Sequence, residues 1–134
     1  MGSTALEQEA LGRFVASGGF ARHLRRVRPI YRRRREAAIR MITQLLPNAS
    51  WRGAAAGLHV YVDLGEPIDV QALGVAMYER GVVIEDAARH WADPSGAGAS
   101  LVVGYGGHPE PALRRALRLL ARTAAEIRDA PRAR

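Results

Sequence analysis

Residues 57–64 read Gly57-Leu58-His59-Val60-Tyr61-Val62-Asp63-Leu64, and this stretch decides the fold class. Apolar residues occupy every second position and alternate with His59, Tyr61 and Asp63. Such alternation is the pattern of a strand with one buried face. A strand of this kind needs other elements packed against its apolar face, so the stretch predicts a sheet that is covered on one side.

The sequence that follows the strand alternates helix and strand signals. Asp69 can cap a helix, and Gly81 can end that helix in a left-handed turn. Residues 82–84 then predict a short strand, and residues 101–103 predict another. Strands separated by a helix and loops in this order are typical of a small sheet with helices beside it.

Residues 104–111 join the last predicted strand to the last helix. Gly104 and Gly106 hold the place of a dinucleotide-binding loop, but Pro109 stands where the third glycine is needed and no parallel βαβ unit encloses them. We therefore interpret the glycines as a tight turn. Pro109 or Pro111 opens the helix. Its apolar face carries Leu113, Ala116, Leu117, Leu120, Ala124 and Ile127.

The sequence that precedes the strand predicts a short helix and then a long one. Apolar residues at helical spacing end near Phe14, where Gly18 and Gly19 interrupt the pattern. The second helix covers about residues 20–46. Its apolar stripe consists of Phe20, Leu24, Val27, Tyr31, Ala38, Ile42 and Leu45. We expect a kink or a break at Pro29, because proline removes a backbone donor and crowds the carbonyl four residues earlier.

Together these elements predict an α+β fold. We expect a small antiparallel or mixed sheet of about three strands, with helices packed on one face and a long arginine-rich helix in front of it. The predicted divisions are a short N-terminal helix over residues 1–18, a small domain over 19–128 and a frayed tail over 129–134. With 134 residues and 48% hydrophobic composition, one domain can bury a core.

The composition excludes several classes of site. The sequence has twenty arginines and no lysine, so it lacks the residue that a Schiff base with pyridoxal phosphate requires. It has no cysteine for a disulfide or a thiolate metal site, and its four histidines are too dispersed to predict a metal site. We assign no catalytic, cofactor-binding or metal-ligating residue.

The N-terminus and the apolar runs also bear on location. No run approaches the roughly 20 apolar residues of a membrane span, and the N-terminus lacks the charged-then-apolar order of a secretory signal. We therefore expect a cytoplasmic protein with no membrane partner.

The positive charge is concentrated in the first part of the chain. Residues 1–56 hold eleven arginines against three glutamates, a net +8, whereas residues 57–134 hold nine arginines against ten acids, a net −1. These arginines can contact phosphate or face another protein. We favour the protein interface, because only one aromatic residue interleaves with them and no complete nucleic-acid motif is present. The candidate interface or anion-contact residues are Arg22, Arg25, Arg26, Arg28, Tyr31, Arg32 and Arg33.

One run of the sequence resembles a known family. It reads Gly18-Gly19-Phe20-Ala21-Arg22-His23-Leu24-Arg25-Arg26-Val27-Arg28-Pro29-Ile30-Tyr31-Arg32-Arg33-Arg34-Arg35. It is similar to the segment that leads into the C-terminal small domain of MocR-type regulators. In these members of the GntR family, a winged helix-turn-helix is fused to an aminotransferase-like domain of fold type I. The later landmarks Ala56-Gly57-Leu58-His59-Val60, Gly81-Val82 and Leu101-Val102-Val103-Gly104-Tyr105 agree with the resemblance.

The resemblance implies parts that this chain lacks. In such dimeric proteins the large domain supplies the Schiff-base lysine, the aspartate that faces the pyridine nitrogen and the phosphate-binding groups, and the winged helix binds DNA. The small domain commonly supplies an arginine for the substrate carboxylate on the strand before the last helix, where this sequence has Val102. We expect pyridoxal phosphate in the resembling full-length proteins and no cofactor in this chain alone.

Three hypotheses follow from these observations. The first is a truncated or split small domain of a MocR-type transcriptional regulator, which is not an enzyme on its own. The second is an arginine-rich module that binds nucleic acid or an acidic partner. The third is a small subunit that completes a separately encoded, lysine-bearing large domain. Under the first we expect self-association, because an isolated small domain exposes apolar surface that its large domain or partner subunit would cover.

Overall fold

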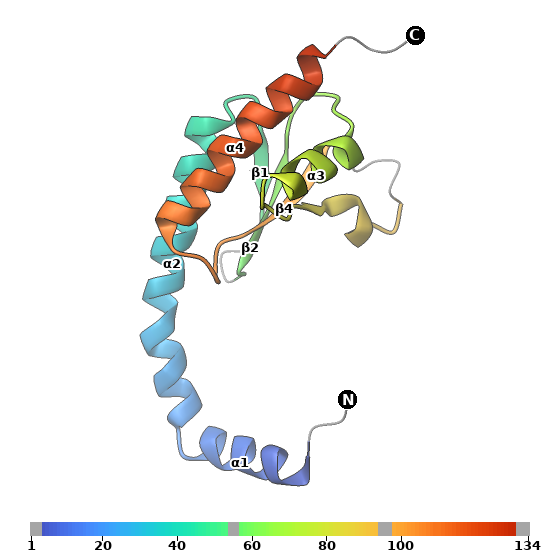
Figure 1. Ribbon diagram of the computed structural model, residues 1–134. Helices are drawn as coiled ribbons and strands as arrows, with labels where there is room; N and C mark the ends of the chain where they lie inside the picture. The colour runs from blue at the N-terminus through green and yellow to red at the C-terminus, as the bar shows by residue number, and fades with distance from the viewer. Residues whose placement is uncertain (1–3, 54–56, 94–97, 131–134) are drawn as a thin grey trace. The chain divides into compact units, whose positions relative to one another are not determined.

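The computed structural model describes residues 4–53, 57–93 and 98–130 of the chain. The chain divides into two units, residues 1–33 and residues 34–134. The first unit contains helix α1 and the start of helix α2, and the second contains the end of α2, a sheet and two further α-helices (Figure 1). No helix of the described residues is long and apolar enough to cross a lipid bilayer.

The first unit has the predicted short helix followed by the start of the long one. Helix α1 covers Ala5–Ala16 and begins with a reciprocal cap: Glu7 N donates to Thr4 Oγ1 at 3.4 Å, and Thr4 N donates to Glu7 Oε2 at 2.9 Å. Gly18 adopts φ 77°, which ends the helix at little conformational cost. Helix α1 has no buried residue.

Helix α2 covers Gly19–Leu45 and continues through Pro29. Of the predicted kink or break at Pro29, the break is therefore wrong. Proline removes the donor that the carbonyl of Arg25 would have used. Because Arg25 is exposed, water can hydrogen-bond to this carbonyl, so the helix loses one internal bond without burying an unsatisfied group.

The second unit contains a four-stranded antiparallel sheet. Its strands are β1 (Ser50–Arg52), β2 (His59–Asp63), β3 (Glu85–Asp86) and β4 (Ser100–Gly104), in the order β1-β2-β4-β3. Of the predicted antiparallel or mixed sheet, the antiparallel form is thus observed, and the α+β class is confirmed. In the central pair, Val60 lies opposite Val103 and Val62 opposite Leu101.

Two details of the predicted sheet need correction. Strand β1 was not predicted, so the sheet has four strands instead of about three. The strand expected at residues 82–84 is also wrong, because the third strand of the chain is the pair Glu85–Asp86. Val82 and Ile84 pack partly buried against the core. Their apolar character reflects this packing and not strand pairing.

Two helices of the second unit begin and end where the sequence predicted. Helix α3 covers Val70–Glu79, and Asp69 Oδ1 accepts hydrogen bonds from the backbone of its first turn at 3.0 Å. Gly81 follows with φ 80°. Helix α4 covers Glu110–Asp129 after Pro109. Residues 131–134 of the predicted frayed tail lie outside the described residues.

The core of the second unit lies between one face of the sheet and the helices. Val60 and Val62 of β2 are fully buried, whereas Tyr61 between them is exposed, as the alternation predicted. The C-terminal part of α2 contributes Ala38, Met41 and Ile42. The helices α3 and α4 contribute Leu73, Met77, Leu113, Leu117 and Leu120. The helices α2, α3 and α4 thus pack on one face of the sheet, and on the other face, which we call the open face, Tyr61 is 39% exposed.

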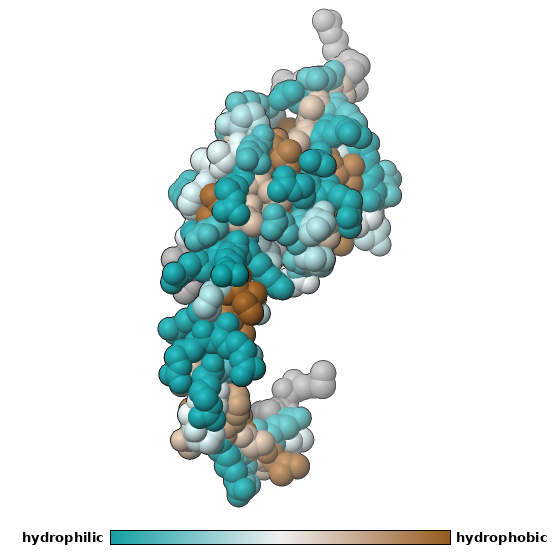
Figure 2. All heavy atoms as spheres, turned by 90° about the vertical axis from the view of Figure 1, so that its left-hand side faces the viewer, coloured by the Kyte–Doolittle hydropathy of each residue, from teal (hydrophilic) through white to brown (hydrophobic). Residues whose placement is uncertain are grey.

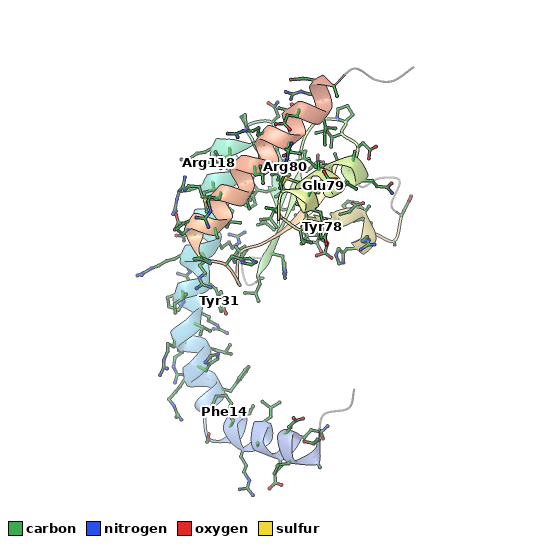
Figure 3. The ribbon with its side chains drawn as sticks, viewed as in Figure 1. Phe14, Tyr31, Tyr78, Glu79, Arg80 and Arg118 are labelled. Atoms are coloured by element: carbon green, nitrogen blue, oxygen red, sulfur yellow. The ribbon has the colours of Figure 1, made fainter. Side chains whose placement is uncertain are left out.

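Polar contacts join α3 to α4 beside this core. The Arg80 guanidinium donates to Thr123 Oγ1 and pairs with Glu126 Oε2 at 2.6 Å. Figure 3 labels Arg80 at the end of α3, next to α4. Thr123 is 1% exposed, so its hydroxyl needs a partner inside the protein. Arg80 supplies that partner.

Candidate functional site

The predicted interface residues all lie on the part of α2 that belongs to the first unit. The arginines at positions 22, 25, 26, 28, 32 and 33 are exposed, and Tyr31 is half-buried. Figure 2 shows hydrophilic atoms over most of this stretch, with some hydrophobic atoms among them. Figure 3 shows the side chains around Tyr31 extending to several sides of the helix. The arginines therefore form no single narrow stripe.

The acidic residues of the first unit are engaged elsewhere. Glu9 pairs with Arg13 within α1 at 2.6 Å, and Glu7 completes the cap at Thr4. The Arg22 guanidinium donates to the backbone carbonyl of Ser17 at 3.4 Å. Within the described residues of this unit, the positive charge of α2 is therefore not neutralised by Glu7 or Glu9.

The first unit also exposes apolar side chains beside these arginines. The exposed fraction is 60% for Leu11, 50% for Val15, 43% for Phe14 and 42% for Phe20. Ile30 is likewise exposed on α2. Apolar and cationic side chains side by side are typical of protein interfaces that involve arginine.

Arg34 and Arg35 continue the same arginine run but have a different role. They belong to the second unit, where the Arg34 guanidinium donates to the Gly106 carbonyl at 2.5 Å. The Arg35 guanidinium donates to the Gly53 carbonyl at 3.3 Å and lies 5.5 Å from the centre of the Trp51 ring. These two arginines thus hold loops and strand β1 to the helix, a structural role that the charge pattern alone did not distinguish.

The open face of the sheet holds a cavity of about 420 Å³, which we call the open-face cavity. Its lining consists of Ser50 and Arg52 of β1, Tyr61 and Asp63 of β2, Ser100 of β4 and residues 90–92. The residues of β1, β2 and β4 share this face because they are opposite one another in the register, Ser50 with Asp63, Arg52 with Tyr61 and Asp63 with Ser100.

One wall of the open-face cavity is aromatic and is held in place by polar contacts. The His90 ring meets the Tyr61 ring edge to face, with centroids 6.5 Å apart, and His90 Nε2 lies 2.7 Å from Glu85 Oε1. Asp86 caps the short 3-10 helix η1 (Ala87–His90) by accepting from Ala88 N at 2.9 Å. Trp91 follows directly and is 41% exposed. These contacts fix the segment that carries the wall.

The sequence predicted none of the residues of the open-face cavity as a site. The sequence indicated Asp63 only as an outward-facing residue of the strand, and its carboxylate also accepts from Gly65 N at 2.9 Å. The available signal was that Tyr61 and Asp63 point away from the core while neighbouring strands present Arg52 and Ser100 on the same face. Without the strand pairing, residues so far apart in the sequence could not be brought together.

Val102 lies on the same face of β4 but does not line the open-face cavity. It is opposite Tyr61 in β2 and Glu85 in β3. This is the strand position at which the resemblance implied a carboxylate-binding arginine, and an aliphatic side chain cannot serve that purpose. In the part of the chain that the structure describes, no group of three or more His, Asp or Glu side chains could hold a metal ion.

Comparisons with known proteins agree with this architecture. No family model matches the chain. The chain is 33% identical over 126 residues to the HTH-type pyridoxine biosynthesis transcriptional regulator PdxR of Corynebacterium glutamicum. It is similar in structure to the kynurenine aminotransferase of Pyrococcus horikoshii, with a TM-score of 0.78 and 21% identity over 88% of this chain. It is also similar to the multiple substrate aminotransferase of Thermococcus profundus, with a TM-score of 0.76 and 22% identity over 87% of this chain.

The chain resembles the C-terminal small domain of a MocR-type regulator. The similarity in sequence to PdxR and the aminotransferase fold both support the resemblance. The small domain spans only part of these proteins: the match covers 25% of PdxR and 29% of each of the two aminotransferases.

The residues of this small domain do not fit covalent attachment of a pyridoxal cofactor. The Pyrococcus horikoshii structure was determined in complex with PMP. The present chain contains no lysine, so it has no amine side chain for a Schiff base. Covalent attachment of such a cofactor to a side chain would require a lysine outside this sequence.

Proposed function

We propose that this chain is the small-domain portion of an aminotransferase-like transcriptional regulator of the MocR kind, and that it has no catalytic activity of its own. On this proposal it completes the shape and interface of a lysine-bearing large domain, in the same chain or in a second one. The 33% identity to PdxR over 94% of the chain carries the proposal, since a transcriptional regulator contains a segment similar to nearly all of this sequence.

The sequence contains no lysine, which supports the proposal that this chain forms no Schiff base with pyridoxal phosphate. Mixing the purified chain with pyridoxal phosphate should leave the absorbance of the cofactor that of the free aldehyde. A shifted absorbance band that remains with the protein after gel filtration would contradict the proposal. A lysine-containing aminotransferase treated in the same way is the positive control.

The proposed interface is the first unit. Exposed apolar side chains of α1, such as Leu11 and Phe14, lie in the same unit as the exposed arginines at the start of α2. We propose that a large domain or a second copy of the chain covers this surface, with Arg22, Arg25, Arg26, Arg28, Tyr31, Arg32 and Arg33 among the contact residues. The dimer and a cytoplasmic location belong to the same proposal.

Self-association of the purified chain tests this interface. Sedimentation should show a mass that rises with protein concentration. Replacing Leu11 and Phe14 together by Ser should lower that tendency, whereas replacing Val75 and Tyr78 of α3, which are also exposed, should not. A chain that remains monomeric at all concentrations, or two double variants that behave alike, would contradict the proposed surface.

A second candidate function is nucleic-acid binding by the same helix, which the net +8 of residues 1–56 favours. The charge-reversed pair Arg25→Glu and Arg26→Glu can be compared with Arg118→Glu and Arg122→Glu, which change the net charge equally on exposed positions of α4. Retention on duplex DNA that falls steeply with salt, and only in the first pair, would favour this function. Equal losses in both pairs would indicate attraction by net charge alone.

A further inference from the structure

The open-face cavity combines charge and aromatic surface in a way that the proposed function does not use. Its volume of about 420 Å³ lies within the range of small-molecule sites. Its walls come from three strands and from residues 90–92, at the end of η1 and just after it. The strand pairing and the polar contacts around η1 therefore form the cavity before a ligand binds. In a preformed site, less of the binding free energy is lost to ordering of the side chains.

Two opposite charges line the cavity without neutralising each other. Arg52 is opposite Tyr61 and Asp63 is opposite Ser50, so the two charged residues are diagonal neighbours on adjacent strands. The backbone positions of such diagonal neighbours are about 7–8 Å apart. Within the described residues, Arg52 forms no ion pair and Asp63 forms a hydrogen bond to Gly65 N through Oδ1. The other oxygen of the Asp63 carboxylate remains able to accept.

The aromatic wall adds an apolar surface beside these charges. Tyr61, His90 and Trp91 line the cavity, and Tyr61 and Trp91 are 39% and 41% exposed. Aromatic rings of this kind pack against the faces and edges of other rings. The pair of His90 with Glu85 holds one of the rings in place. A flat ring inserted here would therefore meet a wall that is already ordered.

We propose that the open-face cavity binds a small aromatic zwitterion, a molecule that carries one carboxylate and one ammonium group on an aromatic framework. Its carboxylate contacts Arg52, its ammonium group contacts Asp63, and its ring packs against Tyr61 and Trp91. A guanidinium can hold a carboxylate through two parallel hydrogen bonds. A purely anionic ligand would meet the Asp63 carboxylate, and a purely cationic one would meet Arg52, so a dipolar ligand fits best.

This site differs from the strand position that the resemblance implied. Val102 is not part of its lining, and Arg52 comes from strand β1 at the edge of the sheet. The inference does not depend on the proposed regulator function, because every contact is made by residues of this chain.

Three probes that share a phenyl-ethyl framework test the proposal by calorimetry on the full chain. They are L-phenylalanine, phenethylamine, which lacks the carboxylate, and 3-phenylpropionate, which lacks the ammonium group. L-phenylalanine should bind roughly tenfold more tightly than either of the other two, since each loses one charge-assisted contact. Absence of saturable binding by L-phenylalanine would overturn the proposal. Equal affinity of 3-phenylpropionate and L-phenylalanine would also overturn it, since that result indicates a simple anion site.

Variants assign the two charges to the two ends of the ligand. Arg52→Gln should weaken the binding of L-phenylalanine roughly tenfold without weakening that of phenethylamine. Asp63→Asn keeps an oxygen for the hydrogen bond from Gly65 N, and it should weaken L-phenylalanine while leaving 3-phenylpropionate unweakened. Arg122→Gln, at an exposed position of α4, is the matched control and should change neither. If Arg52→Gln behaves like this control, the proposal fails.

A measurement on the unaltered chain keeps the test independent of variant folding. In nuclear magnetic resonance spectra, L-phenylalanine should shift the indole N–H of Trp91 and the backbone amides of Arg52 and Asp63. The indole N–H of Trp51, which lies beside Arg35 and outside the lining, serves as the internal reference. Shifts confined to other parts of the chain would place the ligand elsewhere and refute the site.

Discussion

Residues 4–33 and residues 34–130 show two ways in which helices of one chain are stabilised. In the second region, α2, α3 and α4 bury apolar side chains against a sheet, and Ala38, Ile42 and Leu73 have no exposed surface. In the first region, α1 has a complete N-terminal cap but no buried residue. Capping and helix propensity alone support short helices only marginally in water. Helix α1 therefore gains little stability from burial of its own side chains, in contrast to the helices of the second region.

The largest expected effect contrasts a buried and an exposed leucine. Leu117→Ala removes a side chain that is 3% exposed and should lower the free energy of unfolding by about 2–5 kcal/mol. Leu11→Ala, at 60% exposure, should leave it nearly unchanged in dilute solution. Urea unfolding at low protein concentration measures both. Equal losses would mean that α1 has a packed core, which would remove the contrast between the regions.

Two glycines give the next contrast. Gly65 has φ 72°, and a Cβ atom there would lie 2.0 Å from the Asn48 carbonyl oxygen. Gly65→Ala should therefore cost about 2–4 kcal/mol through strain and overpacking. At Gly19 the Cβ would lie 2.5 Å from the Phe14 ring, an exposed side chain that can rotate away. Gly19→Ala should change the unfolding midpoint little, and a loss as large as that of Gly65→Ala would show that the Phe14 ring is held fixed.

Removal of a helix cap should have a smaller effect on stability, and this effect should differ between the two regions. Asp69→Ala leaves the first turn of α3 without its side-chain acceptor and should lower global stability by about 1 kcal/mol. Thr4→Ala removes the corresponding cap of α1 and should reduce helical circular dichroism without moving the unfolding midpoint. If Thr4→Ala shifts that midpoint as far as Asp69→Ala does, α1 unfolds together with the second region.

The smallest expected effect is the contribution of one carboxylate of the second region, Glu66, to the pH dependence of the folding stability. The hydrogen bond from Arg128, followed by that from Asn48, lowers the pKa of Glu66 below its ordinary value of 4.5. A carboxylate with a lowered folded-state pKa stabilises the fold above the unfolded pKa, and this contribution is lost as the pH falls through the folded value. Glu66→Gln should therefore flatten the stability profile below pH 4.5 and leave its shape above that pH unchanged. If the stability of both proteins falls in the same way below pH 4.5, groups other than Glu66 cause the loss.

The sequence predicted those elements whose signals are local. The alternation at residues 59–63, the cap at Asp69 and the turn at Gly81 lie within a few residues of the structures they specify, and all three are observed. Strand β1 was missed because its three residues are exposed and carry no apolar alternation. Its position depends on pairing with β2 and on the packing of Arg35 against the Trp51 ring, contacts that join distant parts of the sequence.

The same limit applies to the candidate sites. The arginines of α2 are contiguous and could be singled out from the sequence, but their charge did not reveal that Arg34 and Arg35 bond to carbonyls of the second unit. The open-face cavity brings together residues from β1, β2, β4 and the segment after η1. Outward-facing polar residues of separate strands form no recognisable pattern in the sequence. Only the register of the strands shows that they lie close together.

The pairing of Asp63 with Ser100 also constrains the order of events during folding. These two residues begin the central β2–β4 ladder, and residues 64–99, with helix α3, lie between them. Closing so long a loop costs chain entropy before any ladder contact repays it, whereas α3 can form from local contacts. We therefore expect α3 to form early and the β2–β4 ladder to determine the folding rate.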